Sequence, residues 1–150
     1  MSESSYPPIE QMLPHRDPFL FIQSVREVSE DRVVCRGMVK EGHYLSLGNE
    51  APPVLGIEMG AQAAGVHAAL QHREAETFEL APQIGYLVGI RQARFHAKAL
   101  PVGCALSVEA LAQGASGPLA TYLIVVRAEG EENSLVEARI STWAAEEPSL

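Results

Sequence analysis

The longest run of apolar positions in the chain extends from Pro52 to Leu70 and has the composition of a buried helix. It is rich in Ala, Leu and Met, which favour helices, and no further proline occurs before Pro82. Two adjacent prolines open the run, and proline suits the first turn of a helix and little that follows it. The pattern therefore predicts one long buried helix that ends near His72.

Strand-like patterns lie on both sides of this helix. Before it, Phe19 and Phe21 alternate with polar positions, and the turn at Glu30 and Asp31 separates two halves of a predicted hairpin. After it, four segments are separated by turns that contain glycine. Strands segregated from a single apolar helix predict an α+β domain whose antiparallel sheet wraps around that helix. The predicted strands are Phe19 to Ser29, Arg32 to Val39, Ile84 to Lys98, Cys104 to Gln113, Leu119 to Glu129 and Leu135 to Ala144.

The other segments are predicted to be connections and ends. A polar tail from Met1 to Tyr6 precedes a short helix from Ile9 to Leu13. A loop from Glu41 to Ala51 leads into the long helix, and a charged loop from Arg73 to Pro82 follows it. The sequence contains no repeat, so its 150 residues are expected to form one domain, 1–150, with a flexible tail at 1–6.

Composition narrows the classes of protein that fit. A hydrophobic content of 47% with 20% charged residues is typical of a globular protein. No uninterrupted apolar run reaches about 18 residues and no signal peptide opens the chain, so we expect a cytoplasmic protein without membrane association. The net charge of −8 argues against nucleic-acid binding. Cys35 and Cys104 lie in strand-like runs and are expected to be buried free thiols, while the histidines show no metal-binding spacing.

One carboxylate interrupts the apolar helix. Glu58 lies near its start, and Gln62 follows one turn later on the same face. Burial of a charged carboxylate is costly, so this residue needs a partner or a chemical role. It is either an active-site acid or a charge satisfied by the N–H groups of the helix N-terminus, and the residues alone leave both interpretations open.

Three segments carry longer motifs, in the order MLPHRDPFLFIQSV (Met12 to Val25), GIEMGAQAAG (Gly56 to Gly65) and GIRQARFHAKALPVGCALSVEA (Gly89 to Ala110). Together they resemble the β-hydroxyacyl-ACP dehydratases of fatty acid synthesis. The short chain and its GIExxAQA pattern look most like the small dehydratases predicted for aryl polyene synthesis. The resemblance implies the hotdog fold, an antiparallel sheet wrapped around one long central helix.

The resemblance also implies the catalytic pair. Glu58 matches the family's catalytic acid and Gln62 the glutamine that follows it. His43 stands at close to the family's distance from that acid and matches the catalytic histidine, which a partner subunit supplies in the family. The residues after His43 depart from the family's proline- and glycine-rich pattern.

Substrate contacts are implied around this pair. The glycine whose N–H meets the thioester carbonyl in the family is replaced by Pro53, which has no N–H, so Val54 or Leu55 is expected to donate instead. The acyl chain is expected in an apolar tunnel beside the helix, lined by small residues such as Gly60, Ala61 and Ala64. His15 is expected to shape the turn into the first strand, with a substrate contact as the alternative.

The implied reaction is dehydration of a 3-hydroxyacyl thioester carried on acyl carrier protein or on CoA. It needs a base for the C2 proton, a role that suits imidazole, and an acid for the leaving hydroxyl. A carboxylic acid whose pKa is raised by burial suits the second role. No metal or dissociable cofactor is required. Because one sheet around one helix leaves an edge open, a homodimer or a larger assembly of dimers is expected.

A basic strip on one predicted strand has two interpretations. Arg94, His96 and Lys98 alternate along the strand, so all three are expected to point to solvent. The alternative is that Arg94 and Lys98, with Arg91 nearby, dock an acidic carrier protein.

Two further functions stay open. On the same scaffold, Glu58 would activate water or attack the carbonyl of an acyl thioester, which would make the chain a thioesterase. The weakened histidine motif and Pro53 also fit a non-catalytic subunit that binds acyl chains or completes a partner's site. Loss of His43 would stop dehydration but not hydrolysis by the carboxylate alone.

Overall fold

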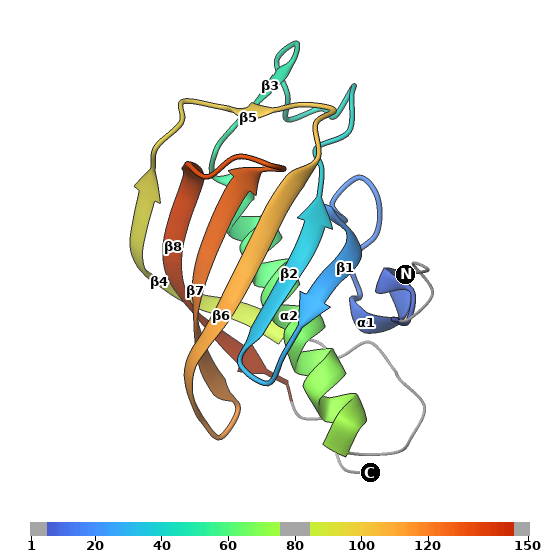
Figure 1. The fold of residues 1–150 in the computed structure, drawn as a ribbon, viewed down its shortest axis with the longest axis vertical. Helices are drawn as coiled ribbons and strands as arrows, with labels where there is room; N and C mark the ends of the chain where they lie inside the picture. Colours follow the sequence, from blue (N-terminus) through green and yellow to red (C-terminus); the bar gives the residue numbers. More distant parts are fainter. Residues whose placement is uncertain (1–5, 76–84, 146–150) are drawn as a thin grey trace.

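The computed structural model describes residues 6–75 and 85–145 of the chain and shows a curved antiparallel sheet around one long helix (Figure 1). The six-stranded sheet has the order β1-β2-β6-β7-β8-β4. Helix α2 packs against β6, β2, β7 and β8, and the sheet lies in front of it in Figure 1. The elements are α1 (Ile9–Met12), β1 (Ile22–Val28), β2 (Arg32–Gly37), β3 (Glu50–Ala51), α2 (Leu55–Ala75), β4 (Gly85–Phe95), β5 (Leu100–Pro101), β6 (Leu106–Ser116), β7 (Leu119–Ala128) and β8 (Ser134–Ala144). The predicted α+β class and helix-in-sheet architecture are therefore confirmed.

The long helix begins later and ends later than predicted. Pro52 and Pro53 lie in a turn before α2, where their carbonyls accept hydrogen bonds from Leu55 N–H at 3.1 Å and Gly56 N–H at 2.9 Å. Proline lacks an N–H but keeps its carbonyl, so the two prolines form the turn into the helix instead of its first turn. At the other end α2 continues to Ala75.

The predicted strands are present with small shifts of their ends. The first begins at Ile22 instead of Phe19, because the segment before it is held by the side chain of Gln62 on α2, as described below. The strand predicted from Cys104 begins at Leu106, and Cys104 lies in the exposed turn before it. The expectation of a buried Cys104 is therefore wrong, whereas Cys35 is a buried thiol whose pKa burial raises to about 12.

The sequence pattern missed one small sheet. β3, at the end of the segment predicted as a plain loop, pairs with β5 through Glu50 opposite Pro101 and Ala51 opposite Leu100. Each strand has two residues, too few for an alternation of polar and apolar positions to be recognised. The pairing of β3 with β5 joins the segment that leads into α2 to the segment that leads into β6.

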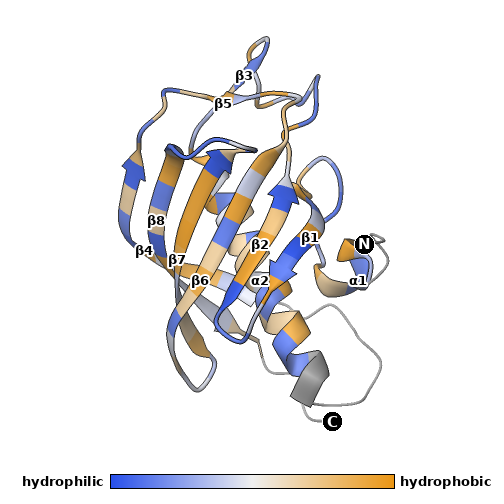
Figure 2. Cartoon of the chain, in the orientation of Figure 1, coloured by the Kyte–Doolittle hydropathy of each residue, from blue (hydrophilic) through white to orange (hydrophobic). Residues whose placement is uncertain are grey.

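The core lies between α2 and the concave face of the sheet. Figure 2 shows strands banded by alternating hydrophilic and hydrophobic residues, as expected when one face packs and the other meets water. The tail predicted at residues 1–6 and the loop predicted from Arg73 to Pro82 lie largely outside the described residues; Tyr6 packs against the core. Within the described part of the chain, no helix is long and apolar enough to cross a membrane.

Candidate active site

Glu58 and Gln62 meet on one face of α2, as their spacing predicts. The Gln62 side-chain amide donates a hydrogen bond to Glu58 Oε1 at 3.1 Å. The same amide donates to the carbonyl of Phe19 at 2.7 Å, and its oxygen accepts from the N–H of Phe21 at 2.9 Å. Gln62 is 1% exposed, so these protein groups satisfy it completely in the core. Gln62 was expected to bind substrate, but its contacts make it a positioning residue that fixes both Glu58 and the chain entering β1.

His15 is the histidine that contacts Glu58 within the chain. Its Nε2 lies 3.4 Å from Glu58 Oε1, and the two side chains are 31% and 39% exposed. The Arg16 guanidinium holds the turn that presents His15, because it donates to the carbonyls of Leu13 at 2.8 Å and Glu10 at 3.1 Å. His15 Nδ1 is buried and has no hydrogen-bond partner among the described residues.

The charge of Glu58 is set by opposing effects. Burial raises the pKa of its carboxyl, while the hydrogen bonds from His15 and Gln62 lower it, and so does the charge of His15. The lowering effects win, so the pKa lies below the usual glutamate range. The expectation of a carboxyl kept protonated by burial is therefore wrong for the chain on its own.

His43 lies in a different environment from the one predicted. It is buried, with Nε2 2.8 Å from the carbonyl of Pro18 and Nδ1 3.1 Å from the N–H of Leu45. Because a carbonyl only accepts and an N–H only donates, Nε2 carries the proton and Nδ1 is the acceptor. Its ring stacks on Tyr44 and packs against Phe21. Both nitrogens are thus engaged within the chain, and the catalytic role of His43 stays a prediction.

The start of α2 offers one of the two expected N–H donors. Leu55 N–H is already bonded to the carbonyl of Pro52 at 3.1 Å, so it is not available to a thioester oxygen. Val54 N–H has no acceptor among the described residues, and the Val54 side chain is exposed. Leu55 N–H is therefore occupied within the chain, and the role of Val54 as a donor to substrate stays a prediction.

Gly60 does not line a tunnel. A Cβ added at this position would lie 2.0 Å from Cγ2 of Ile124 on β7, so the helix backbone already touches the sheet there. The absence of a side chain at Gly60 serves close helix–sheet packing, and the expectation of a substrate contact there is wrong. Ala64 is buried in the same core, and Ala61 is partly buried against it.

The basic strip lies on β4 and in the segment that follows it. Arg91, Arg94 and Lys98 are exposed, as expected. His96 is exposed too, but its Nε2 also contacts Glu137 Oε2 on β8 at 3.2 Å. In the described ranges, no group of His, Cys, Asp or Glu side chains is arranged to hold a metal ion.

Sequence reasoning gave His15 a turn-forming role and missed its contact with Glu58. The two residues are far apart in the chain, and their contact depends on the Gln62 hydrogen bonds that draw Phe19 and Phe21 onto α2. The LPHR motif that contains His15 was the only available signal.

An antiparallel sheet wrapped around one long central helix is the hotdog fold, and a single carboxylate lies in the first turns of that helix. The chain belongs to the ApeP-like family, described as ApeP dehydratase, whose model matches residues 7–149. The family is one of dehydratases, which are hydro-lyases.

Individual relatives agree with this family. FabZ, a 3-hydroxyacyl-[acyl-carrier-protein] dehydratase of Anaeromyxobacter sp., is 32% identical over 130 residues, which cover 82% of this chain and 80% of the relative. An uncharacterized thioester dehydrase of Halalkalibacterium halodurans is 28% identical over 141 residues, covering 91% and 86%. Among solved structures, the dehydratase heterocomplex ApeI:P from Xenorhabdus doucetiae matches with a TM-score of 0.79 and 27% identity over 94% of this chain and 93% of that one.

Proposed function

We propose that this chain dehydrates 3-hydroxyacyl thioesters carried on acyl carrier protein, with Glu58 and His15 moving the protons. The observation that carries the proposal is the 3.4 Å contact between His15 Nε2 and Glu58 Oε1 beside the start of α2. The substrate class comes from relatives named as 3-hydroxyacyl-[acyl-carrier-protein] dehydratases. A carrier protein of this kind fits the expected cytoplasmic location.

The elimination needs one mobile proton on the pair. The lowered pKa of Glu58 favours the ionised carboxylate, and in the proposed reaction the mobile proton starts on the imidazole of His15, which lies 3.4 Å away. In that state Glu58 takes the C2 proton, the C2–H electrons form the C2=C3 bond, and the C3 hydroxyl leaves as water with the proton from His15. Proton transfer from Glu58 back to His15 restores the pair. These roles are the reverse of those implied by the family resemblance.

Three features of the site support substrate binding around this pair. Among the described residues the Val54 N–H at the positive end of α2 has no acceptor, which supports its use as a donor to the thioester carbonyl. Gln62 holds Glu58 in one orientation through its own buried contacts. The exposed side chains of Phe19 and Tyr44, which touch each other edge to face, offer an apolar surface near the chain that Gln62 binds.

The test compares three variants in a dehydration assay with a 3-hydroxyacyl thioester. Glu58→Gln and His15→Gln are each expected to lower kcat by about 10²–10⁴-fold, the usual contribution of a positioned acid or base. His43→Gln is the matched control, and its melting temperature is measured because His43 is buried. If His43→Gln is folded but inactive while His15→Gln stays active, the proton-transferring histidine is His43 and not His15. Release of free thiol by the wild-type chain would favour the thioesterase alternative.

A second candidate function is that of a subunit in a heteromeric dehydratase. It is favoured by Pro53, which removes a donor from the oxyanion site, and by the likeness to a solved dehydratase heterocomplex. The purified chain would then show no turnover alone, and turnover would appear when a second hotdog-fold subunit is added. Turnover by the chain alone would exclude this candidate.

A further inference from the structure

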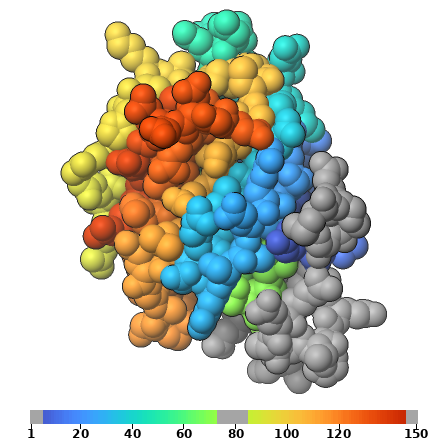
Figure 3. Space-filling model, viewed as in Figure 1, coloured from blue at the N-terminus to red at the C-terminus, as the bar shows by residue number. Residues whose placement is uncertain are grey.

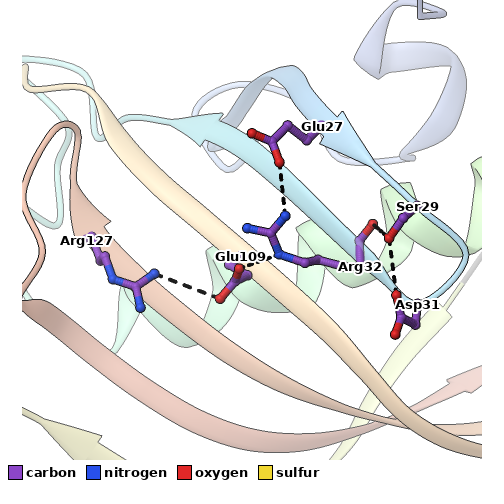
Figure 4. Close-up of polar contacts among 6 residues, drawn as sticks. All are labelled: Glu27, Ser29, Asp31, Arg32, Glu109 and Arg127. Atoms are coloured by element: carbon purple, nitrogen blue, oxygen red, sulfur yellow. Dashed lines mark hydrogen bonds and ion pairs between the residues drawn. The ribbon is translucent and has the colours of Figure 1, made fainter.

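Arg32 and Arg36 of β2 alternate with buried core residues, so they lie on the outer face of the sheet, which is turned toward the viewer in Figures 1 and 3. Arg127 of β7 lies on the same face beside them, although the chain carries a net charge of −8. Most of these arginines have glutamate partners. Arg32 contacts Glu109 at 2.6 Å and Glu27 at 3.0 Å, and Arg127 lies 3.8 Å from Glu109 (Figure 4). Such exposed pairs neutralise each other and leave little charge for a ligand.

Arg139 on β8 is different. It is exposed and has no carboxylate partner among the described residues. Gln92 lies directly opposite it on β4, and Arg94 lies opposite Glu137 two pairs further along. These positions surround a pocket of about 250 Å³, the β4–β8 pocket. It is lined by Gln92, Arg94, Leu123, Glu137, Ala138 and Arg139.

The one carboxylate of the pocket is already engaged. Glu137 Oε2 lies 3.2 Å from His96 Nε2, and its Oε1 accepts a hydrogen bond from the Ser134 hydroxyl at 3.1 Å. These two hydrogen bonds, and the nearby charges of His96 and Arg94, lower the pKa of Glu137. The carboxylate thus contacts His96 and Ser134, and the Arg139 guanidinium and the Gln92 amide have no hydrogen-bond partner among the described residues.

We propose that the β4–β8 pocket binds a phosphate group of the thioester carrier. Guanidinium groups bind phosphate oxygens through paired N–H donors, and a neighbouring amide adds a further hydrogen bond. The proposal rests on the proposed function, because acyl carrier protein presents its thioester on a phosphopantetheine arm and CoA also carries phosphates. Of the three residues predicted to dock a carrier, only Arg94 lines this pocket; Arg139 was not predicted.

A dimer formed at the β4 edge would leave the pocket open. Edge-to-edge pairing extends the sheet within its own plane, whereas the pocket opens from the outer face between β4 and β8. The arginine at the pocket therefore stays accessible in the assembly expected for this chain.

The kinetic test uses one 3-hydroxyacyl group on three carriers: acyl carrier protein, CoA and N-acetylcysteamine, which has no phosphate. The double variant R94Q/R139Q is expected to raise KM about tenfold for the phosphate-bearing carrier that the site serves, and to leave KM for the N-acetylcysteamine thioester unchanged. A rise in KM for the carrier-protein thioester alone would identify the phosphodiester of its arm as the bound group. A rise in KM for the CoA thioester alone would identify a phosphate of CoA as the bound group. R26Q/R36Q, which removes two positive charges from β1 and β2, is the matched control and is expected to change none of the three KM values.

A binding experiment keeps the proposal separate from catalysis. Pantetheine 4′-phosphate added to the wild-type protein is expected to shift the backbone NMR signals of residues 92–94 and 137–139, and R94Q/R139Q is expected to lose those shifts. This result would support the pocket even if the chain alone shows no turnover. Equal KM changes for all three thioesters, or unmoved signals at these residues, would overturn the proposal.

Discussion

The most informative residue in the chain is Glu58, because its surroundings have opposing effects on the pKa of its carboxyl group. Burial favours the neutral acid, but His15 and Gln62 both hydrogen-bond to the carboxylate, and the pKa is lowered. A carboxyl with a lowered pKa in the folded state stabilises the protein above the unfolded-state pKa. That contribution is lost as the pH falls through the folded-state pKa.

Replacement of Glu58 by Gln should therefore change how stability depends on pH. The free energy of unfolding of wild type minus that of Glu58→Gln is expected to be largest above pH ~5 and to shrink below the ordinary glutamate pKa of about 4.3. Urea unfolding of both proteins across this range measures the difference. Glu50→Gln, at an exposed carboxylate outside the site, is the control. A difference that grows as the pH falls would show that the pKa of Glu58 is raised instead.

For individual residues, the sequence predicted contacts within one helix but missed contacts between different elements of the fold. Glu58 and Gln62 share a helix face through their spacing, and the structure joins them at 3.1 Å. The contact of His15 with Glu58 depends on how the segment before β1 crosses α2, which no local pattern encodes. The burial of His43 likewise arises from Phe21 and the carbonyl of Pro18, which lie far from it in the sequence.

At the scale of elements, the fold depends on how closely α2 approaches the sheet. The small residues of the helix were expected to line a tunnel, but the structure places Gly60 directly against Ile124 of β7. Periodicity also predicted the six long strands, because each has enough residues to show alternation. It missed β3 and β5, which are defined by hydrogen bonds between two short segments and not by any pattern in either.

Gly60→Ala should destabilise the protein although alanine is the better helix former. The helix propensity gain is about 1 kcal/mol, but the added Cβ would lie 2.0 Å and 2.8 Å from two carbons of Ile124, so α2 or β7 must move. Overpacking of this kind costs about 1–3 kcal/mol or more, and we expect it to exceed the gain. Denaturant unfolding measures the net loss. Gly114→Ala is the control, since its Cβ would meet no atom within 4 Å. Equal stability of the two variants would mean that α2 can shift freely on the sheet.

At the scale of the whole molecule, the two edges of the large sheet differ. β1 forms one edge and β4 the other. β4 exposes Tyr86, Val88 and Ile90, which are 55%, 55% and 49% exposed. A long edge strand with exposed apolar side chains is open to pairing with another chain. The same strand carries Gln92 and Arg94, so an assembly at this edge would bring the β4–β8 pockets of two chains toward each other.

We predict that the chain forms a homodimer through β4, and that a charge placed on this edge weakens it. Val88→Lys introduces an ammonium group where an exposed apolar side chain stands, and lysine on an edge strand opposes pairing because its desolvation is unfavourable. Light scattering and sedimentation velocity at micromolar concentration should show a dimer for wild type and a shift toward monomer for Val88→Lys. Gln23→Lys places the same charge on β1 and should leave the dimer intact. A wild-type chain that is monomeric alone, and that dimerises only with a different hotdog-fold subunit, would contradict the homodimer and assign the β4 edge to a heteromeric partner.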